Sequence, residues 1–152
     1  MTNQSLTDAL AQESDITPEG EKSVLCQGTR MTYEVGPTSV LLVAHQGSEV
    51  PLLLAPESDY TRQADKIGVS EESKIGTDEF DQKYVIRDTL NQAQRLLTEP
   101  VCELVEALEP FVELEFCDDM LRLLKNPSDH AGVVTDLKRL ARLADHLREQ
   151  FK

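Results

Sequence analysis

The sequence lacks tryptophan and is poor in aromatic residues, with three Tyr and four Phe among 152 residues. It contains no apolar run close to the roughly 18 residues that are needed to cross a bilayer. Its first residues, MTNQSLTDALAQESD, lack the basic and then apolar pattern of a secretory signal. We therefore expect a cytoplasmic protein without membrane insertion. The 39% apolar and 28% charged content is typical of a soluble globular domain.

Basic residues are also scarce: 15 Lys and Arg face 28 Asp and Glu, which gives a net charge of −13. A nucleic-acid-binding protein needs a basic surface to displace counterions from phosphates. An anionic membrane surface likewise attracts basic segments. These totals argue against both partners. They fit a basic protein partner, and they equally fit an acidic surface that only keeps the protein soluble.

Motifs for catalysis, cofactors or metals are missing from the sequence. The three cysteines, Cys26, Cys102 and Cys117, are odd in number and contain no CxxC pair, so we expect free thiols. There is no GxSxG, no HExxH and no glycine-rich phosphate loop, and no two of the three histidines stand at metal-ligand spacing. We therefore expect a non-enzymatic protein with no catalytic residues, no metal site and no cofactor.

Several short segments have the composition and alternation of β-strands. TRMTYEV and TSVLLVAH are separated by a Gly-Pro turn signal, and EVPLLLA follows, which predicts a three-stranded meander within residues 23–55. EFDQKYVIR, at 79–87, predicts a fourth strand. Apolar and acidic residues alternate in PFVELEFCDDMLRLLK, at 110–125, which predicts a hairpin. The polar segment 1–22 is expected to be a flexible tail or a short helix.

Helical spacing appears after residue 88 and again after residue 128. Apolar residues recur every three or four positions from Leu90 to Leu108, but Pro100 interrupts them. This predicts two short helices, about 89–97 and 99–108, or one kinked helix. The fold class is therefore α+β: an antiparallel sheet made of the meander, a fourth strand and a hairpin, with two main helices on one face. Residues 23–152 are expected to form a single domain.

The last helix, which we expect to start at Ser128 or Asp129, carries an apolar stripe. Its members are Val133, Leu137, Leu140, Ala144, Leu147 and Phe151. Two interpretations remain open for this stripe. It covers the sheet of its own chain, or it meets a second chain, so that the protein is a monomer or a homodimer. Leu137, Leu140, Ala144, Leu147 and Phe151 are candidate interaction residues on the second interpretation.

An acidic span separates Arg95 from Arg122, with no Lys or Arg in between. Glu103 and Glu106 share a predicted helix face, and Glu113 and Glu115 share a predicted strand face. A calcium loop would require a dense, glycine-turned pattern of ligands, which this span lacks. The span is therefore either a solvated acidic face or a docking surface for a basic protein.

The second half of the chain resembles a module of uncharacterised bacterial proteins. The resemblance lies in the GTDEFD turn at residues 76–81 and in the LLTEP helix signal at residues 96–100. The match covers about residues 75–150 and implies no activity. The element order is also similar to that of type III secretion chaperones, which are small acidic proteins ordered as a helix, three strands, a helix, two strands and a helix. That resemblance implies a dimer that escorts an exported protein.

We therefore expect a non-enzymatic acidic protein that serves as a protein-binding module for an unknown protein partner. The alternative is a dimeric export escort similar to type III secretion chaperones.

Overall fold

The computed structural model describes residues 3–45, 51–56, 84–87, 93–117 and 120–150. The strands are β1 (Ile16–Gly20), β2 (Ser23–Cys26), β3 (Thr29–Val35), β4 (Val40–Ala44), β5 (Leu52–Pro56), β6 (Tyr84–Arg87), β7 (Glu113–Phe116) and β8 (Leu121–Lys125). The helices are α1 (Asn3–Ala11), α4 (Ala93–Leu96), α5 (Glu99–Glu106) and α6 (His130–Gln150).

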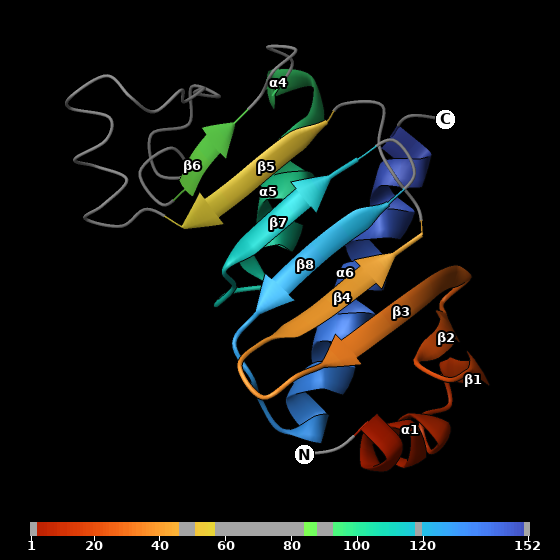
Figure 1. The fold of residues 1–152 in the computed structure, drawn as a ribbon. Helices are drawn as coiled ribbons and strands as arrows, with labels where there is room; N and C mark the ends of the chain where they lie inside the picture. The colour runs from red at the N-terminus through yellow and green to blue at the C-terminus, as the bar shows by residue number, and fades with distance from the viewer. Residues whose placement is uncertain (1–2, 46–50, 57–83, 88–92, 118–119, 151–152) are drawn as a thin grey trace.

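The strands form one antiparallel sheet in the order β1-β2-β3-β4-β8-β7-β5-β6. Figure 1 shows α5 and α6 behind this sheet, and α1 beside its β1 end. The expected α+β class with an antiparallel sheet is confirmed. Among the described residues, no helix combines the length and the apolar character needed to cross a membrane.

The predicted meander is only half correct. β3 and β4 pair as expected, from Met31 with Ala44 to Val35 with Val40. The third strand, β5, does not pair with β4, because the β7–β8 hairpin lies between them. β8 offers β4 the same alternating apolar face that β5 would offer, with Leu121 and Leu123 buried. Neighbourhood along the chain therefore does not decide which strand pairs with β4.

The other predicted elements are found in part. β7 and β8 form the expected hairpin, with Leu114 opposite Leu123. β6 pairs with β5 as a fourth strand, but residues 79–83 of the predicted strand lie outside the described residues. The interruption at Pro100 separates α4 from α5, as the two-helix interpretation requires.

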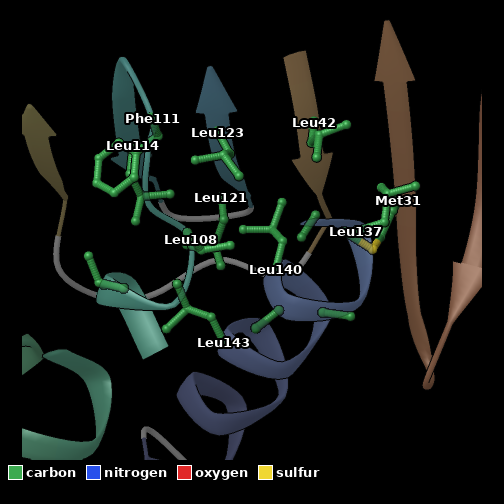
Figure 2. Close-up of a cluster of buried hydrophobic side chains, with 14 of the residues drawn as sticks. Met31, Leu42, Leu108, Phe111, Leu114, Leu121, Leu123, Leu137, Leu140 and Leu143 are labelled. Carbon is green, nitrogen blue, oxygen red and sulfur yellow. The ribbon is translucent and has the colours of Figure 1, made fainter. Parts of the chain in front are cut away.

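The core lies between the sheet and its helices. Leu42 of β4, Leu123 of β8 and Leu140 of α6 are fully buried there, and Figure 2 shows them gathered between the two layers. Asp129 begins α6, because its carboxylate accepts a hydrogen bond of 2.8 Å from the backbone N–H of Gly132. This start agrees with the predicted one.

The N-terminal segment forms a helix and then a strand. Of the two expectations for residues 1–22, the described part takes the helix, α1, and adds β1, which the sequence analysis did not predict. Leu6 and Leu10 are fully buried, and the hydroxyl groups of Thr7 and Tyr33 share a hydrogen bond of 2.8 Å. Glu13 and Asp15 follow α1 in the chain. The Lys138 ammonium of α6 lies 2.6 Å from Glu13 and 3.3 Å from Asp15.

We expect Lys138→Met to loosen α1 without unfolding the sheet. The hydrogen bond to Glu13 raises the pKa of Lys138. Desolvation raises the pKa of Asp15, but hydrogen bonds, first that of Lys138, outweigh it and leave that pKa below its usual 3.8. The stabilising effect of Asp15 is therefore present above pH 3.8 and lost as the pH falls through its lowered pKa.

Hydrogen exchange of the α1 amides measures this effect. Exchange should be faster in Lys138→Met than in the wild type at neutral pH, and unchanged in a control, Arg142→Met, on an exposed position of the same helix. Equal α1 exchange in both variants would show that the Lys138 contacts do not hold α1.

Candidate functional site

The apolar stripe of α6 lies inside the molecule. Leu137, Leu140, Ala144 and Leu147 are all 0% exposed in a single chain, whereas Phe151 lies outside the described residues. This burial agrees with the interpretation in which the stripe covers the sheet of its own chain, and not with the alternative in which it meets a second chain. These four side chains pack against the sheet of their own chain, because one face of that sheet needs an apolar cover.

The acidic candidates do not come together. Glu103 and Glu106 lie on α5, which covers the helix side of the sheet, and Glu103 is exposed. Glu113 and Glu115 occupy the positions of β7 that alternate with the buried Leu114 and Phe116, so they point to the opposite side. Two separate acidic pairs therefore replace the single acidic docking surface that was one of the expectations.

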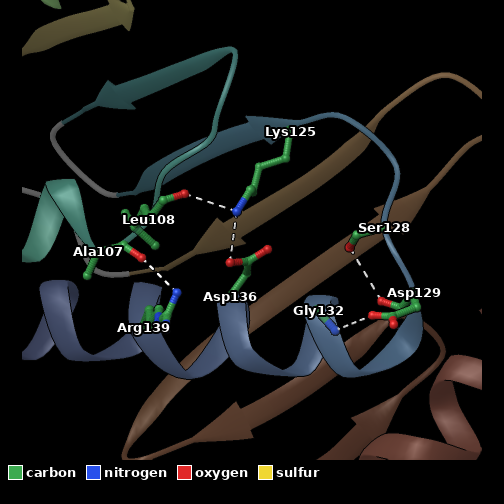
Figure 3. A network of polar contacts seen from close by, with 8 residues as sticks. All are labelled: Ala107, Leu108, Lys125, Ser128, Asp129, Gly132, Asp136 and Arg139. Carbon is green, nitrogen blue, oxygen red and sulfur yellow. Dashed lines mark hydrogen bonds and ion pairs between the residues drawn. The ribbon is translucent and has the colours of Figure 1, made fainter. Parts of the chain in front are cut away.

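A cavity of about 410 Å³ lies beside the start of α6. Its lining includes the end of β8 and the first three turns of α6, with Lys125, Ser128, Asp136 and Arg139 among the polar members. Figure 3 shows the contacts of these side chains. This region combines charge and burial, so it is the first place to look for chemistry.

The centre of this region is a buried ion pair between Lys125 and Asp136. Lys125 Nζ lies 2.8 Å from Asp136 Oδ1 and donates a second hydrogen bond of 3.0 Å to the carbonyl of Leu108. The two residues are only 8% and 7% exposed. The pair connects the end of β8, the segment after α5 and α6. Its role is therefore structural.

The neighbouring polar groups also make contacts within the chain. Arg139 donates a hydrogen bond of 2.9 Å to the carbonyl of Ala107. The Asp129 carboxylate accepts a hydrogen bond from the N–H of Gly132. At Gly132 the chain is closely packed, because a Cβ atom there would come within 2.8 Å of Ser128 Oγ. The cavity therefore has charged walls whose members stabilise the junction of α5, β8 and α6, and we assign it no acid–base chemistry.

The buried thiol of Cys26 is a poor nucleophile. Burial, followed by the nearby Asp15, raises the pKa of Cys26 to about 11, so this thiol stays protonated. None of the three cysteines forms a disulfide. Within the ranges that the structure describes, no group of three or more His, Cys, Asp and Glu side chains is arranged to hold a metal ion.

The side of the sheet away from the helices carries more aliphatic residues than a water-facing surface needs. We call this side the open face, defined by Thr32, Glu34, Leu41, Val43, Leu53, Arg87, Glu113, Glu115, Arg122 and Leu124. Leu41, Val43, Leu53 and Leu124 are half-buried, and they alternate with fully buried core residues on their strands. Figure 1 views the sheet from this side, with α5 and α6 behind it.

Only Glu113 and Glu115 of the open face were predicted as candidate contact residues, although the sequence also carries a signal for its aliphatic part. VLLVA in β4 and LLLA in β5 are apolar at successive positions, so both faces of these strands carry aliphatic side chains. A strand with one face in water normally alternates apolar and polar residues.

Comparison with known proteins yields a likeness of fold only. No family model matches the sequence, and no curated protein matches it. Among solved structures, the chain is similar to the mycobacterial trehalose monomycolate transport factor A, TtfA, with a TM-score of 0.57 and 15% sequence identity. The likeness covers 97% of this chain and 84% of TtfA, so the two proteins share the arrangement of their backbones over nearly the whole of this chain.

Proposed function

We propose that this chain is a non-enzymatic protein-binding module and that the open face is its contact surface. The observation that carries the proposal is the set of half-buried aliphatic side chains at the outward positions of β4, β5 and β8. These side chains neighbour one another across the sheet, and apolar side chains gathered on one surface are a known feature of protein-binding sites.

The charges of the open face support a protein partner. Arg122 Nη1 lies 3.5 Å from Glu115 Oε1, and these two side chains are 48% and 42% exposed. One cation and one anion side by side, surrounded by aliphatic groups, match the mixed composition of protein interfaces. A nucleic acid would require a basic surface instead.

The test is site-specific crosslinking followed by a binding measurement. A photoreactive amino acid replaces Val43 on the open face or, as a control, the exposed Arg142 on α6. We expect Val43 to crosslink to a discrete protein in the native cell, and Arg142 not to. The captured protein must then bind the purified chain, and Val43→Asp must weaken that binding at least ~10-fold, because a charge is placed in an apolar contact.

Equal crosslinking from both positions, or binding that Val43→Asp leaves unchanged, would reject the open face as the contact surface. Arg142→Asp serves as the matched variant for the binding measurement, since it introduces the same side chain on the helix side of the molecule.

A second candidate places this binding in transport or export across a membrane, with the chain acting from the cytoplasm. It is supported by the similarity of the fold to a transport factor over 97% of the chain. The chaperone-like export escort is one form of it. The identity of the crosslinked protein distinguishes the candidates: a secreted protein or a membrane transporter would favour export, and a soluble protein that stays inside the cell would count against it.

A further inference from the structure

One row of neighbouring residues crosses the open face and has opposite charges on the two sides of its centre. The registers place six residues side by side on successive strands, from β3 to β6: Thr32, Val43, Arg122, Glu115, Leu53 and Arg87. The middle of this row reads apolar, cationic, anionic, apolar. The centre of the pattern is the line between β8 and β7, where Arg122 and Glu115 pair within one chain.

This pattern is complementary to itself in a face-to-face dimer. We place a two-fold axis between the two sheets, parallel to the strands and above the line between β8 and β7. This axis brings β8 of one subunit opposite β7 of the partner subunit. Arg122 then faces the partner's Glu115, and Val43 faces the partner's Leu53. Sheets pack about 10 Å apart, a gap that the combined lengths of an Arg and a Glu side chain can bridge.

We infer that the open face binds a second copy of this chain. This inference rests on the proposed function and names the partner for the same surface. The symmetry forms each contact twice, because two-fold interfaces use the same patch on both subunits. The dimer then has two charged contacts between the chains, besides the Arg122–Glu115 ion pair within each chain. The Val43 side chain of each subunit is covered by the partner's Leu53.

The charge balance of the open face permits such a contact in spite of the net charge of −13. Two cations, Arg87 and Arg122, stand against three anions, Glu34, Glu113 and Glu115, so this face is much closer to neutral than the whole chain. In the adjacent row, Glu34 and Glu113 flank Leu41 and Leu124. Glu113 is exposed and opens β7, so its carboxylate can stay in water at the rim.

A face-to-face dimer requires a broad surface, and the row spans most of the width of the sheet. A standard interface buries about 800 Å² per partner, which is about a tenth of the 8317 Å² surface of this chain. The row alone crosses six of the eight strands of the sheet.

The experiment exchanges the two charges separately. Arg122→Glu places four acids at the interface, and Glu115→Arg places four cations there. We expect sedimentation velocity of the wild-type full chain to show a monomer–dimer equilibrium, and each variant alone to dimerise at least ~10-fold more weakly, because like charges oppose at an interface. An equal mixture of the two variants should dimerise as the wild type does, since each charge again meets its opposite.

Arg30→Glu is the matched control. Arg30 forms a comparable ion pair of 3.4 Å with Glu19, near the β1 edge of the sheet, away from the proposed axis. Its reversal should leave the dimer unchanged. Circular dichroism of every variant shows whether the fold is intact. A second test does not depend on the charge variants: in a cysteine-free background, a mixture of Val43→Cys and Leu53→Cys chains should be joined by a bis-maleimide crosslinker about as long as the ~10 Å gap between the sheets, which is too wide for a direct disulfide.

A wild type that remains monomeric at several hundred micromolar would overturn the inference, and so would a variant mixture no stronger than its components. If the crosslinks from Val43 then lead to a different protein that passes the binding test, the proposed function stands and only the second copy is rejected. If Val43 yields no specific protein at all, both are rejected.

Discussion

Leu140→Asp lowers the free energy of unfolding by about 3 kcal/mol or more, as expected for a buried charge left without a partner. Leu140 is 0% exposed and stands in the middle of α6, on the side that faces the sheet. The substitution removes an apolar side chain from a closely packed core and puts a carboxylate in its place. A domain of this size is stable by only about 5–15 kcal/mol, so a large part of its stability is lost.

Urea denaturation of the full chain, followed by circular dichroism at one low protein concentration, measures the loss. Arg142→Asp, at an exposed position two residues later on the same helix, introduces the same side chain and should cost under about 1 kcal/mol. A Leu140→Asp variant as stable as this control would mean that α6 does not cover the sheet as described.

Asp136→Ala is expected to cost about 3–5 kcal/mol, because it leaves the Lys125 ammonium buried without its carboxylate. Lys125 keeps its hydrogen bond to the Leu108 carbonyl, but that bond does not neutralise the charge. Replacing both charges at once, by Lys125→Met and Asp136→Leu, should cost much less than the single change, since no charge then remains buried.

Two comparisons make this result specific. Asp145→Ala removes the carboxylate of an exposed ion pair with Arg148 on the same helix, and should cost under about 1 kcal/mol. If the double apolar variant is as unstable as Asp136→Ala, the loss comes from packing at the junction of β8 and α6 and not from the stranded ammonium.

Local signals in the sequence predicted the elements that depend on local physics. The alternation of Leu114 and Phe116 with glutamates indicates a strand with one wet face, and Pro100 ends one helix and begins the next. The stripe through Leu137 and Leu140 has the period of a helix that covers a core. Each of these patterns is complete within about ten residues, so no knowledge of distant segments is required.

The remaining features depend on partners that are distant in sequence. β1 contains Pro18 and Gly20, and four of its five residues are exposed, so its composition is that of a loop. It is a strand because β2 pairs with it. The neighbour of β4 could not be predicted either, since β5 and β8 present similar apolar faces to it.

The candidate site was only partly accessible from the sequence. Lys125 follows Leu121 and Leu123 at every second position, so alternation alone places it on the core face of β8. That Asp136 meets it follows from the packing of α6, which the sequence does not specify. The acids on α5 and β7 are close in sequence but lie on opposite sides of the sheet, because a helix and a strand direct their side chains independently.

The insertion of β7 and β8 between β4 and β5 also sets the order in which the molecule can be completed. During synthesis, the first five strands leave the ribosome long before the hairpin that joins them, which ends only at Lys125. Until then β4 has β3 on one side and an unpaired edge on the other. Contacts of such long sequence separation form slowly and leave edges exposed meanwhile. A nascent chain that stops before residue 121 therefore lacks β8, the strand that joins the two parts of the sheet, and leaves the edges of β4 and β7 open to pairing with other strands.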